Sequence, residues 1–288
     1  MSRPEYHIAN FSGGKDSTAM VLHLIERGDP LDEVLCCDTT MEFPAMYRHI
    51  EAVKKVVETA GIKFTTLKAE YDFEYLLLRH IPNRKKEELQ GRIGYSWPGP
   101  LSRWCTRALK VQVMNQHISN LRKKYEVIQY IGLAADEQYR LDRKENQKPH
   151  MRFPLVEWGW AESDALTYCY KRGYDWEGLY KIFNRVSCWC CPLQGFAELK
   201  KLREHFPDLW NKLRELDAQT WRDFRKGYSV IDLEQRFELE EALSKAGHRT
   251  SNRAFHTDLK RLLAGEATIE EILCERLRGE ETNENRHN

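Results

Sequence analysis

The stretch that decides the fold reads FSGGKDST and spans residues 11–18. Residues 6–9 precede it and predict a strand, and residues 19–25 have the i, i+3, i+4 apolar spacing of a helix. A glycine pair between a strand and a helix, here Gly13 and Gly14, lets the backbone turn tightly and approach an anion. Because the first N–H groups of a helix attract phosphate oxygens, the stretch predicts a phosphate-binding loop.

The polar side chains of this loop are candidates for the same site. Ser12 and Ser17 add hydroxyl donors, Lys15 adds a positive charge, and Asp16 is placed to cap the helix or orient the loop. The run lacks the spacing of G-x-x-x-x-G-K-S/T, so it is not that P-loop. It resembles the PP-loop signature S-G-G-x-D-S of ATP pyrophosphatases, which cleave ATP between the α and β phosphates. A glycine-rich turn with a serine or aspartate cap is the structural alternative.

Length and composition narrow the class of protein. The 288 residues suit one large domain or one domain with an appendage. The 45 basic and 44 acidic residues nearly cancel, so overall charge does not indicate a nucleic-acid partner, although local basic patches remain open. With neither a signal-peptide segment nor an apolar run of about 18 residues, we expect a cytoplasmic protein without a membrane partner. The eight unevenly spaced cysteines favour metal or thiol chemistry over disulfides.

Strand and helix patterns alternate through the first part of the chain. Residues 33–38 and 63–67 predict further strands, and a helix is expected over residues 45–60 between them. This alternation predicts an α/β fold with a parallel sheet and right-handed crossovers. Parallel sheets bind ligands beyond the carboxyl ends of their strands, which is where residues 12–17 and 38–44 fall.

Residues 38–44, which read DTTMEFP, resemble the D-T-G-x-x-F-P segment of the phosphoadenosine-phosphosulfate (PAPS) reductase branch of the PP-loop family. ATP-sulfurylase small subunits and DNA phosphorothioation sulfurtransferases lie in the same branch. Thr40 stands where the family has glycine. Arg140 matches the arginine of a G-x-x-x-D-E/S-x-x-R segment, and residues 153–158 resemble a P-L-x-x-W segment.

The resemblance covers about residues 5–195 and implies a nucleotide-binding domain of the adenine nucleotide α-hydrolase type over residues 1–195. It also implies a nucleotide site, in which Lys15, Asp16 and Asp38 are the catalytic candidates. The nucleotide-binding candidates are Ser12, Gly13, Gly14, Lys15, Asp16, Ser17, Asp38, Thr39 and Arg140. The structural alternatives are a helix cap for Asp38 and a solvated charge for Arg140.

The second strong signal is a cysteine cluster, SCWCCP at residues 187–192. Cys188 and Cys191 have the C-x-x-C spacing that lets two thiolates face one ion or cluster, and Cys190 lies between them. The distant Cys105 has cationic neighbours that favour its thiolate. Four sulfurs suffice for a [4Fe–4S] cluster or a four-thiolate zinc site.

The separation of Cys105 from Cys188 resembles that of the cysteine pairs in iron–sulfur adenylylsulfate reductases, which favours iron–sulfur over zinc. Trp104 occupies the place of the first cysteine of that family's pair. An unmetallated buried cluster is the alternative. The other cysteines, in apolar runs or near the C-terminal end, are interpreted as structural: Cys36, Cys37, Cys169 and Cys274.

Two further regions bear on partners. Residues 79–110 interleave basic and aromatic side chains, which suits a nucleic acid or an anionic substrate as well as a solvated loop. Residues 196–278 predict a helical appendage whose apolar spacing indicates core and whose basic spots suit a polymeric substrate or a partner protein. The polar tail, residues 279–288, is expected to be disordered.

These features favour ATP-dependent adenylyl transfer coupled to sulfur chemistry, with Mg²⁺, a thiol or sulfur carrier, and an acceptor that includes nucleic acid among its candidates. PAPS reduction with release of sulfite is the second hypothesis. It is less favoured because the S-G-G-x-D-S run is intact and residues 273–276, LCER, match the reductases' E-C-G-L-H segment poorly. A nucleotide- and metal-sensing module without catalysis, which recruits a partner, is the third.

Overall fold

The computed structural model describes residues 3–284, and the chain divides into two units, Met1–Gln194 and Gly195–Asn288. The first unit contains a five-stranded parallel sheet with the strand order β3-β2-β1-β4-β5. The strands are β1 (Glu5–Phe11), β2 (Glu33–Asp38), β3 (Lys63–Lys68), β4 (Glu126–Ile131) and β5 (Met151–Arg152). The α/β fold expected from the sequence is confirmed.

The strand order reverses at β1, because the chain proceeds from β1 to β2 and β3 on one side and continues with β4 and β5 on the other. Such a reversal leaves a crevice beyond the carboxyl ends of the central strands. The glycine loop follows β1, and Asp38 ends β2. The topology therefore brings these two segments to the same edge of the sheet.

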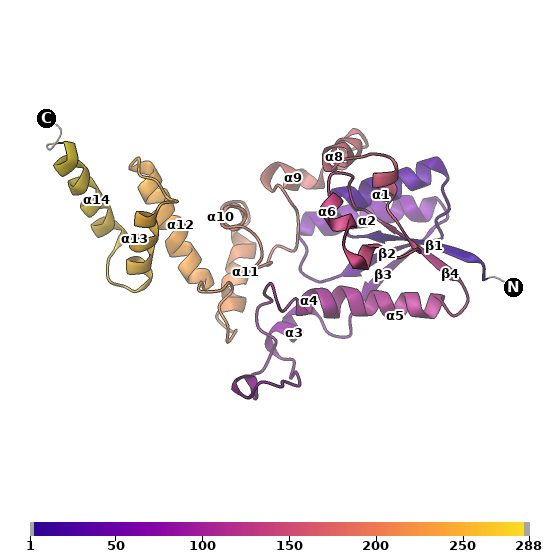
Figure 1. Cartoon of the computed structure of the whole chain (residues 1–288), viewed down its shortest axis with the longest axis horizontal. Coiled ribbons are helices and arrows are strands. Elements are labelled where there is room, and N and C mark those ends of the chain that lie inside the picture. Colours follow the sequence, from indigo (N-terminus) through magenta and orange to yellow (C-terminus); the bar gives the residue numbers. More distant parts are fainter. Residues whose placement is uncertain (1–2, 285–288) are drawn as a thin grey trace. The chain divides into compact units, whose positions relative to one another are not determined.

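Helices cover both faces of the sheet (Figure 1). On one face lie α1 (Lys15–Arg27), α2 (Pro44–Thr59) and α8 (Glu162–Lys171), and on the other lies α5 (Gln112–Leu121). The α5 side is sealed by buried Ile8, Leu35, Ile118 and Val127. In β2 the consecutive residues Val34, Leu35 and Cys36 are all buried, as cover on both faces of the sheet requires.

Shorter elements complete the first unit. The helices are α3 (Phe73–Leu78), α4 (Trp104–Thr106), α6 (Gln138–Leu141), α7 (Pro154–Glu157) and α9 (Leu179–Ile182). Single 3₁₀ turns occupy Glu87–Leu89, Lys144–Asn146 and Trp176–Gly178, and a π-helical turn occupies Arg107–Val111 between α4 and α5. The strand β5 has only two residues, which is too short to produce a period-2 pattern in the sequence.

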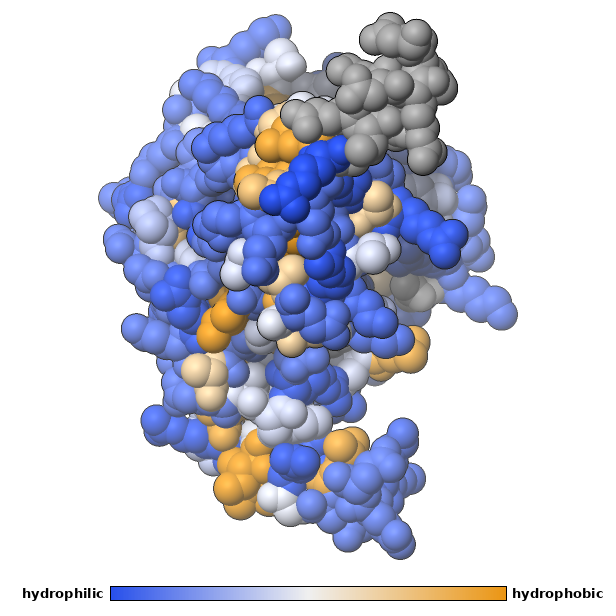
Figure 2. Space-filling view, turned by 90° about the vertical axis from the view of Figure 1, so that its left-hand side faces the viewer, coloured by the Kyte–Doolittle hydropathy of each residue, from blue (hydrophilic) through white to orange (hydrophobic). Residues whose placement is uncertain are grey.

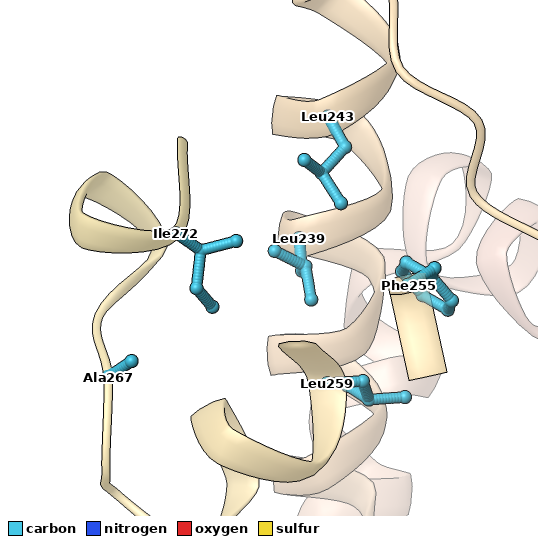
Figure 3. Close-up of a cluster of buried hydrophobic side chains, with 6 residues drawn as sticks. All are labelled: Leu239, Leu243, Phe255, Leu259, Ala267 and Ile272. Atoms are coloured by element: carbon cyan, nitrogen blue, oxygen red, sulfur yellow. The ribbon is translucent and has the colours of Figure 1, made fainter. Parts of the chain in front are cut away.

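The second unit is helical, as the sequence predicts. Its helices are α10 (Phe196–His205), α11 (Pro207–Asp217), α12 (Val230–Lys245), α13 (Arg253–Leu263) and α14 (Ile269–Glu284). Figure 3 shows part of its core, where Ile272 of α14 is directed towards Leu239 of α12. Phe255 and Leu259 of α13 belong to the same buried cluster.

Two boundaries in this unit differ from the sequence prediction. The expected helical run from residue 196 is interrupted, because Pro207 has no N–H to continue α10 and instead occupies the first turn of α11. The tail expected to be disordered from residue 279 belongs to α14 as far as Glu284, and residues 285–288 lie outside the described part of the chain. The helical pattern that begins at Ile269 extends further than its polar composition suggests.

The surface is largely hydrophilic. On the face drawn in Figure 2, hydrophobic residues gather in separate small groups among polar ones, consistent with a mean hydropathy of −0.67. Among residues 3–284, no helix combines the length and the apolar composition that crossing a membrane requires.

Candidate functional site

The glycine loop between β1 and α1 is fixed by close packing. Gly13 has a φ of +79°, and a Cβ there would lie 2.7 Å from the Met46 sulfur, so the position demands glycine on both counts. The indole N–H of Trp176 donates to the Gly13 carbonyl over 2.8 Å, and the Ser17 hydroxyl donates to the Gly14 carbonyl over 3.0 Å. These bonds hold the loop in one conformation at the start of α1.

The end of β4 presses against this loop. A Cβ on Gly132 would lie 2.9 Å from both the Cα and the N of Ser17. Because these are backbone atoms, they could not move away without distorting the loop. The hydroxyls of Ser12 and Ser17 lie 3.1 Å apart within the loop. The loop is thus placed by the ends of β1 and β4 and by Trp176, and its serine hydroxyls face one another.

Lys15 and Asp16 form an ion pair with each other and with α8. The Lys15 ammonium lies 3.0 Å from Asp16 Oδ2 and also contacts the Glu162 carboxylate. Burial lowers the pKa of Lys15, but the two carboxylates outweigh it and raise the pKa, so the ammonium stays charged. Neither Lys15 nor Asp16 is among the described residues that line the two cavities below. Their catalytic role stays a prediction.

One cavity lies beyond the carboxyl ends of β1, β2 and β3, and we call it the strand-end cavity. Its volume is about 460 Å³. Its lining includes Ser12, Asp38, Glu42, Tyr47, Lys68 and Lys110. Its size and its mixture of apolar walls with a few polar groups are typical of a small-ligand site.

Asp38, a predicted nucleotide-site residue, lines this cavity. Its carboxylate accepts hydrogen bonds from the Thr40 N–H over 2.8 Å and the Tyr47 hydroxyl over 3.1 Å, and it pairs with Lys68 over 3.0 Å. Burial raises the pKa of Asp38, but these three partners outweigh it and hold the pKa below its ordinary value. Asp38 is therefore an ionised carboxylate in a fixed orientation.

Thr40 explains a departure from the family pattern. Its φ is +63°, in the left-handed region that glycine adopts readily and a β-branched residue adopts only rarely. The position that is glycine in the resembled segment thus has a backbone conformation that favours glycine in this chain, although the residue is threonine. In this conformation the Thr40 N–H reaches Asp38.

The second cavity, of about 290 Å³, is lined by all four predicted metal-ligating cysteines, and we call it the cysteine cavity. Cys105 comes from α4, and Cys188, Cys190 and Cys191 come from the segment after α9. The structure therefore brings together two parts of the chain that are more than 80 residues apart.

Thr39 faces this cavity rather than the strand-end cavity. Its hydroxyl donates to Glu42 Oε1 over 3.0 Å and lies 3.7 Å from the Cys188 sulfur. The Cys188 thiol in turn donates to the same Glu42 oxygen over 3.3 Å. Glu42 therefore connects the DTTMEFP segment with the cysteine cluster.

The π-helical turn at Arg107–Val111 contains Lys110 and begins two residues after Cys105. A π turn is wider than an α turn, which brings side chains five residues apart closer to the same face. Both Cys105 and Lys110 line the cysteine cavity. The irregular turn is therefore part of how one helix supplies a thiol and a cation to the site.

Three residues, Ser12, Glu42 and Lys110, line both cavities. The Lys110 ammonium lies 3.8 Å from Glu42 Oε1. Burial lowers the pKa of Lys110, but the acidic groups around it, among them the Glu42 carboxylate, raise it by more, so the cation persists at the junction. The sequence analysis did not single out Glu42 or Lys110, because each reads as one ordinary charge in its own segment.

The cysteine cavity has the donor set for a soft metal ion or an iron–sulfur cluster, which thiolate ligands select. Lys110, Arg103 and Arg185 also line it and would offset the charge of several thiolates. Burial raises the pKa of Cys188, Cys190 and Cys191, so the free thiols are protonated and a metal must displace their protons.

The residue types that line the cysteine cavity therefore fit a metal site, whereas the positions of their side chains do not define one. Within the described part of the chain, no three Cys, His, Asp or Glu side chains converge as a metal site. The ligand set Cys105, Cys188, Cys190 and Cys191 stays a prediction.

Arg140, the predicted contact for an anionic group, is engaged elsewhere. Its guanidinium pairs with the Glu137 carboxylate over 2.6 Å. Among the described residues, it does not line either cavity. Cys36 and Cys37, interpreted as core, both border the strand-end cavity, although Cys36 is buried.

Fold and site together define an α/β domain with a thiol-lined cavity beside its glycine loop. The family model described as the phosphoadenosine phosphosulfate reductase domain matches residues 7–194, and the chain belongs to this family. Membership indicates an enzyme domain that uses adenylyl nucleotides in sulfur chemistry.

Two uncharacterised proteins of Methanocaldococcus jannaschii are similar to the chain. MJ0973 is 28% identical over 211 residues, covering 70% of this chain and 45% of that protein. MJ0066 is 28% identical over 213 residues, covering 70% and 39%. The chain spans less than half the length of these relatives.

A solved structure, the U34-tRNA thiolase NcsA from Methanococcus maripaludis with its [4Fe–4S] cluster, shares 15% sequence identity with the chain. It aligns with a TM-score of 0.38 over 76% of this chain and 73% of NcsA.

Proposed function

We propose that this chain binds ATP in the strand-end cavity, transfers the adenylyl group to an acceptor, and couples that transfer to sulfur chemistry at the cysteine cavity. The observation that carries the proposal is the junction of the two cavities at Ser12, Glu42 and Lys110. A nucleotide held by the glycine loop and a sulfur-bearing group among the cysteines would meet there. Family membership over residues 7–194 supports the adenylyl nucleotide as the substrate class.

The reaction proposed has two displacements. An acceptor oxygen attacks the α-phosphorus of ATP, the bond from that phosphorus to the bridging oxygen breaks, and pyrophosphate leaves. A sulfur nucleophile from a thiol or sulfur carrier then attacks the activated carbon of the acceptor, and AMP leaves with the former acceptor oxygen. The acceptor we favour is a group on a nucleic acid.

The chain's own groups stabilise the charge that develops. Loop N–H groups and the Lys110 ammonium would face the phosphate oxygens, where fixed donors act most strongly. The predicted role of Lys15 requires that a phosphate oxygen replace Glu162 as its partner. Asp38, Glu42 and Glu51 line the same cavity and supply the hard oxygen ligands that Mg²⁺ takes beside phosphates.

Cys105, Cys188, Cys190 and Cys191 would hold a [4Fe–4S] cluster, or alternatively zinc. When bound, such a centre supplies either electron transfer or a site that holds a sulfur ligand. Iron, zinc and acid-labile sulfide analysis of protein prepared without air tests this part. We expect Cys188→Ser to lose the metal, whereas Cys274→Ser, an exposed thiol on α14, should keep it. A colourless protein with one zinc per chain would contradict the cluster.

The catalytic part is tested with α-labelled ATP and with sulfur-labelled PAPS under anaerobic conditions. We expect ATP to yield labelled AMP or an adenylated acceptor, and Lys110→Met to abolish this product. Lys55→Met, which changes an exposed lysine on α2, is the matched control and should retain it. Sulfite release from PAPS without ATP cleavage, or ATP binding without any turnover, would overturn the proposal.

PAPS reduction is the second candidate, and the family model favours it directly. In that reaction a carrier thiolate attacks the sulfuryl sulfur, the bond to the nucleotide oxygen breaks, and adenosine 3′,5′-bisphosphate leaves. A second thiol then attacks the resulting thiosulfonate, so that a disulfide forms and sulfite leaves. The labelled-PAPS arm of the same experiment measures this outcome.

A further inference from the structure

Residues 79–107, which we call the basic arm, form a positively charged segment of this chain. The arm carries seven basic and two acidic residues, a formal charge of +5. The remaining residues carry 38 basic and 42 acidic groups, a formal charge of −4. The net charge of the whole chain is therefore near zero because a positive segment and a negative remainder cancel. Such a separation of charge steers polyanions to one place.

Most of the cations of the arm are exposed to solvent. Arg79, Lys85, Lys86, Arg103 and Arg107 are all exposed. Lys86 has an ion-pair partner in Glu88 at 3.7 Å, but both side chains are exposed, so that contact holds it only weakly. Exposed apolar groups lie among these cations: Ile81 is 79% exposed and Leu101 is fully exposed. A group of exposed cations is the electrostatic part of a nucleic-acid surface, because it neutralises backbone phosphates.

The arm is nevertheless anchored to the domain. The Gly94 N–H donates to the His80 carbonyl over 2.7 Å, and the Trp104 indole N–H donates to the Ser96 carbonyl over 2.9 Å. Trp97 is completely buried. A solvated loop without function would not need this framework, which presents the charges in a fixed arrangement.

The inner end of the arm reaches the cysteine cavity. Arg103 and Pro98 line that cavity, and Arg185 lines it from the cysteine segment. An aromatic pair lies beside the arm, where the rings of Tyr71 and Tyr75 stack at 4.4 Å and Tyr71 is 40% exposed. Cations that lead to a cavity can hold the phosphate backbone of a nucleic acid. The exposed aromatic ring beside them can stack with one of its bases.

We propose that the basic arm binds a single-stranded segment of nucleic acid and leads one unpaired nucleotide to the cysteine cavity. The inference rests on the proposed function, because it identifies the acceptor of that reaction. A single strand is required because a cavity of about 290 Å³ takes one small group and not a duplex. A target base inside a duplex must leave its stack before an enzyme can modify it.

The test is fluorescence anisotropy with the full chain and labelled 20-nucleotide single-stranded RNA and DNA, with the matching duplexes, at several salt concentrations. The arm variant carries Arg79→Glu, Lys85→Glu and Lys86→Glu. The control variant carries Lys55→Glu, Lys124→Glu and Lys171→Glu, which reverse three exposed cations of the first unit outside the arm. Thermal unfolding shows whether each variant is folded.

We expect wild type and control to bind single strands more tightly than duplexes, and the arm variant to bind at least ~10-fold more weakly near 0.1 M salt. For the arm variant, the slope of log affinity against log salt should be less negative by about 2. Each of the three lost phosphate contacts contributes about 0.7 to this slope for single strands. Equal affinity of wild type and arm variant would overturn the inference. So would equal losses in both variants, a preference for duplex, or binding of polyglutamate but not of oligonucleotides.

The two proposals fail separately. ATP cleavage by wild type without oligonucleotide binding overturns the role of the arm and leaves adenylyl transfer standing. Oligonucleotide binding without ATP cleavage overturns adenylyl transfer and supports the arm.

Discussion

His49 provides a quantitative test of how the glycine loop is held. It lies on α2, is only 6% exposed, and its Nε2 is 2.9 Å from the Thr18 hydroxyl on α1. The Trp176 ring lies against it at a centroid distance of 4.4 Å, and Trp176 also bonds to Gly13. Burial lowers the pKa of His49 from 6.5 to about 4. The imidazole is therefore neutral beside the loop at neutral pH.

The consequence for stability follows from proton uptake. Between pH 6.5 and pH 4 the unfolded chain binds a proton at His49 that the folded chain does not, so the free energy of unfolding falls as the pH falls. Each pH unit corresponds to about 1.4 kcal/mol, so at pH 5 the loss from this residue is about 2 kcal/mol. Near pH 4 the loss reaches about 3 kcal/mol. Above pH 6.5 the residue adds no pH dependence.

The assay is denaturant unfolding of wild type and His49→Gln at pH 7 and pH 5, followed by a probe of the first unit such as tryptophan fluorescence. Glutamine cannot titrate, so the variant should lose about 2 kcal/mol less than wild type between the two pH values. His205→Gln, at an exposed position on α10, should behave as wild type. The same pH dependence in His49→Gln and wild type would refute the reasoning, as would an NMR titration of His49 near pH 6.5.

Three substitutions test the backbone of the site. Thr40→Gly should leave the first unit about 1 kcal/mol more stable than Thr40→Ala, because only glycine relieves the positive φ; equal melting temperatures would contradict this. Gly132→Ala should destabilise by about 1–3 kcal/mol and weaken nucleotide binding, because its Cβ would meet the Ser17 backbone. Gly99→Ala, which points into open space, is its control, and calorimetric titration with ATP measures both. Trp176→Phe should cost about 1–3 kcal/mol by leaving the Gly13 carbonyl without its donor, and an unchanged unfolding midpoint would count against that bond.

The fold was predictable because its signals are local and repeated. The strand and helix patterns before and after the glycine loop recur at residues 33–38, 45–60 and 63–67, and β2, α2 and β3 lie there within a residue. The two-residue β5 was not predicted, because so short a strand is defined by its pairing with β4 and not by its own sequence. The break at Pro207 was readable, since proline at that position ends one helix and begins another.

The site was predictable only in part. Asp38 and the four cysteines line the two cavities, and their residue types in motif spacing were the signal. Lys15 and Arg140 also belong to motifs, but their side chains pair with acids whose positions depend on the tertiary structure. Glu42 and Lys110, by contrast, could not be predicted, because neither is specified by residue type in a motif. Only the folded chain brings the Lys110 ammonium within 3.8 Å of Glu42 Oε1.

Two irregular backbone segments meet at this junction, and this explains why a regular fold can carry the site. Thr40 in its left-handed conformation turns the chain after β2 so that its N–H reaches Asp38, while Thr39 and Glu42 face the cysteine cavity. The π-helical turn after Cys105 directs Lys110 towards the same junction from the other side. Each irregularity costs stability where it stands, and each directs side chains from one segment into both cavities. Regularising either segment should therefore uncouple the cavities before it disrupts the sheet.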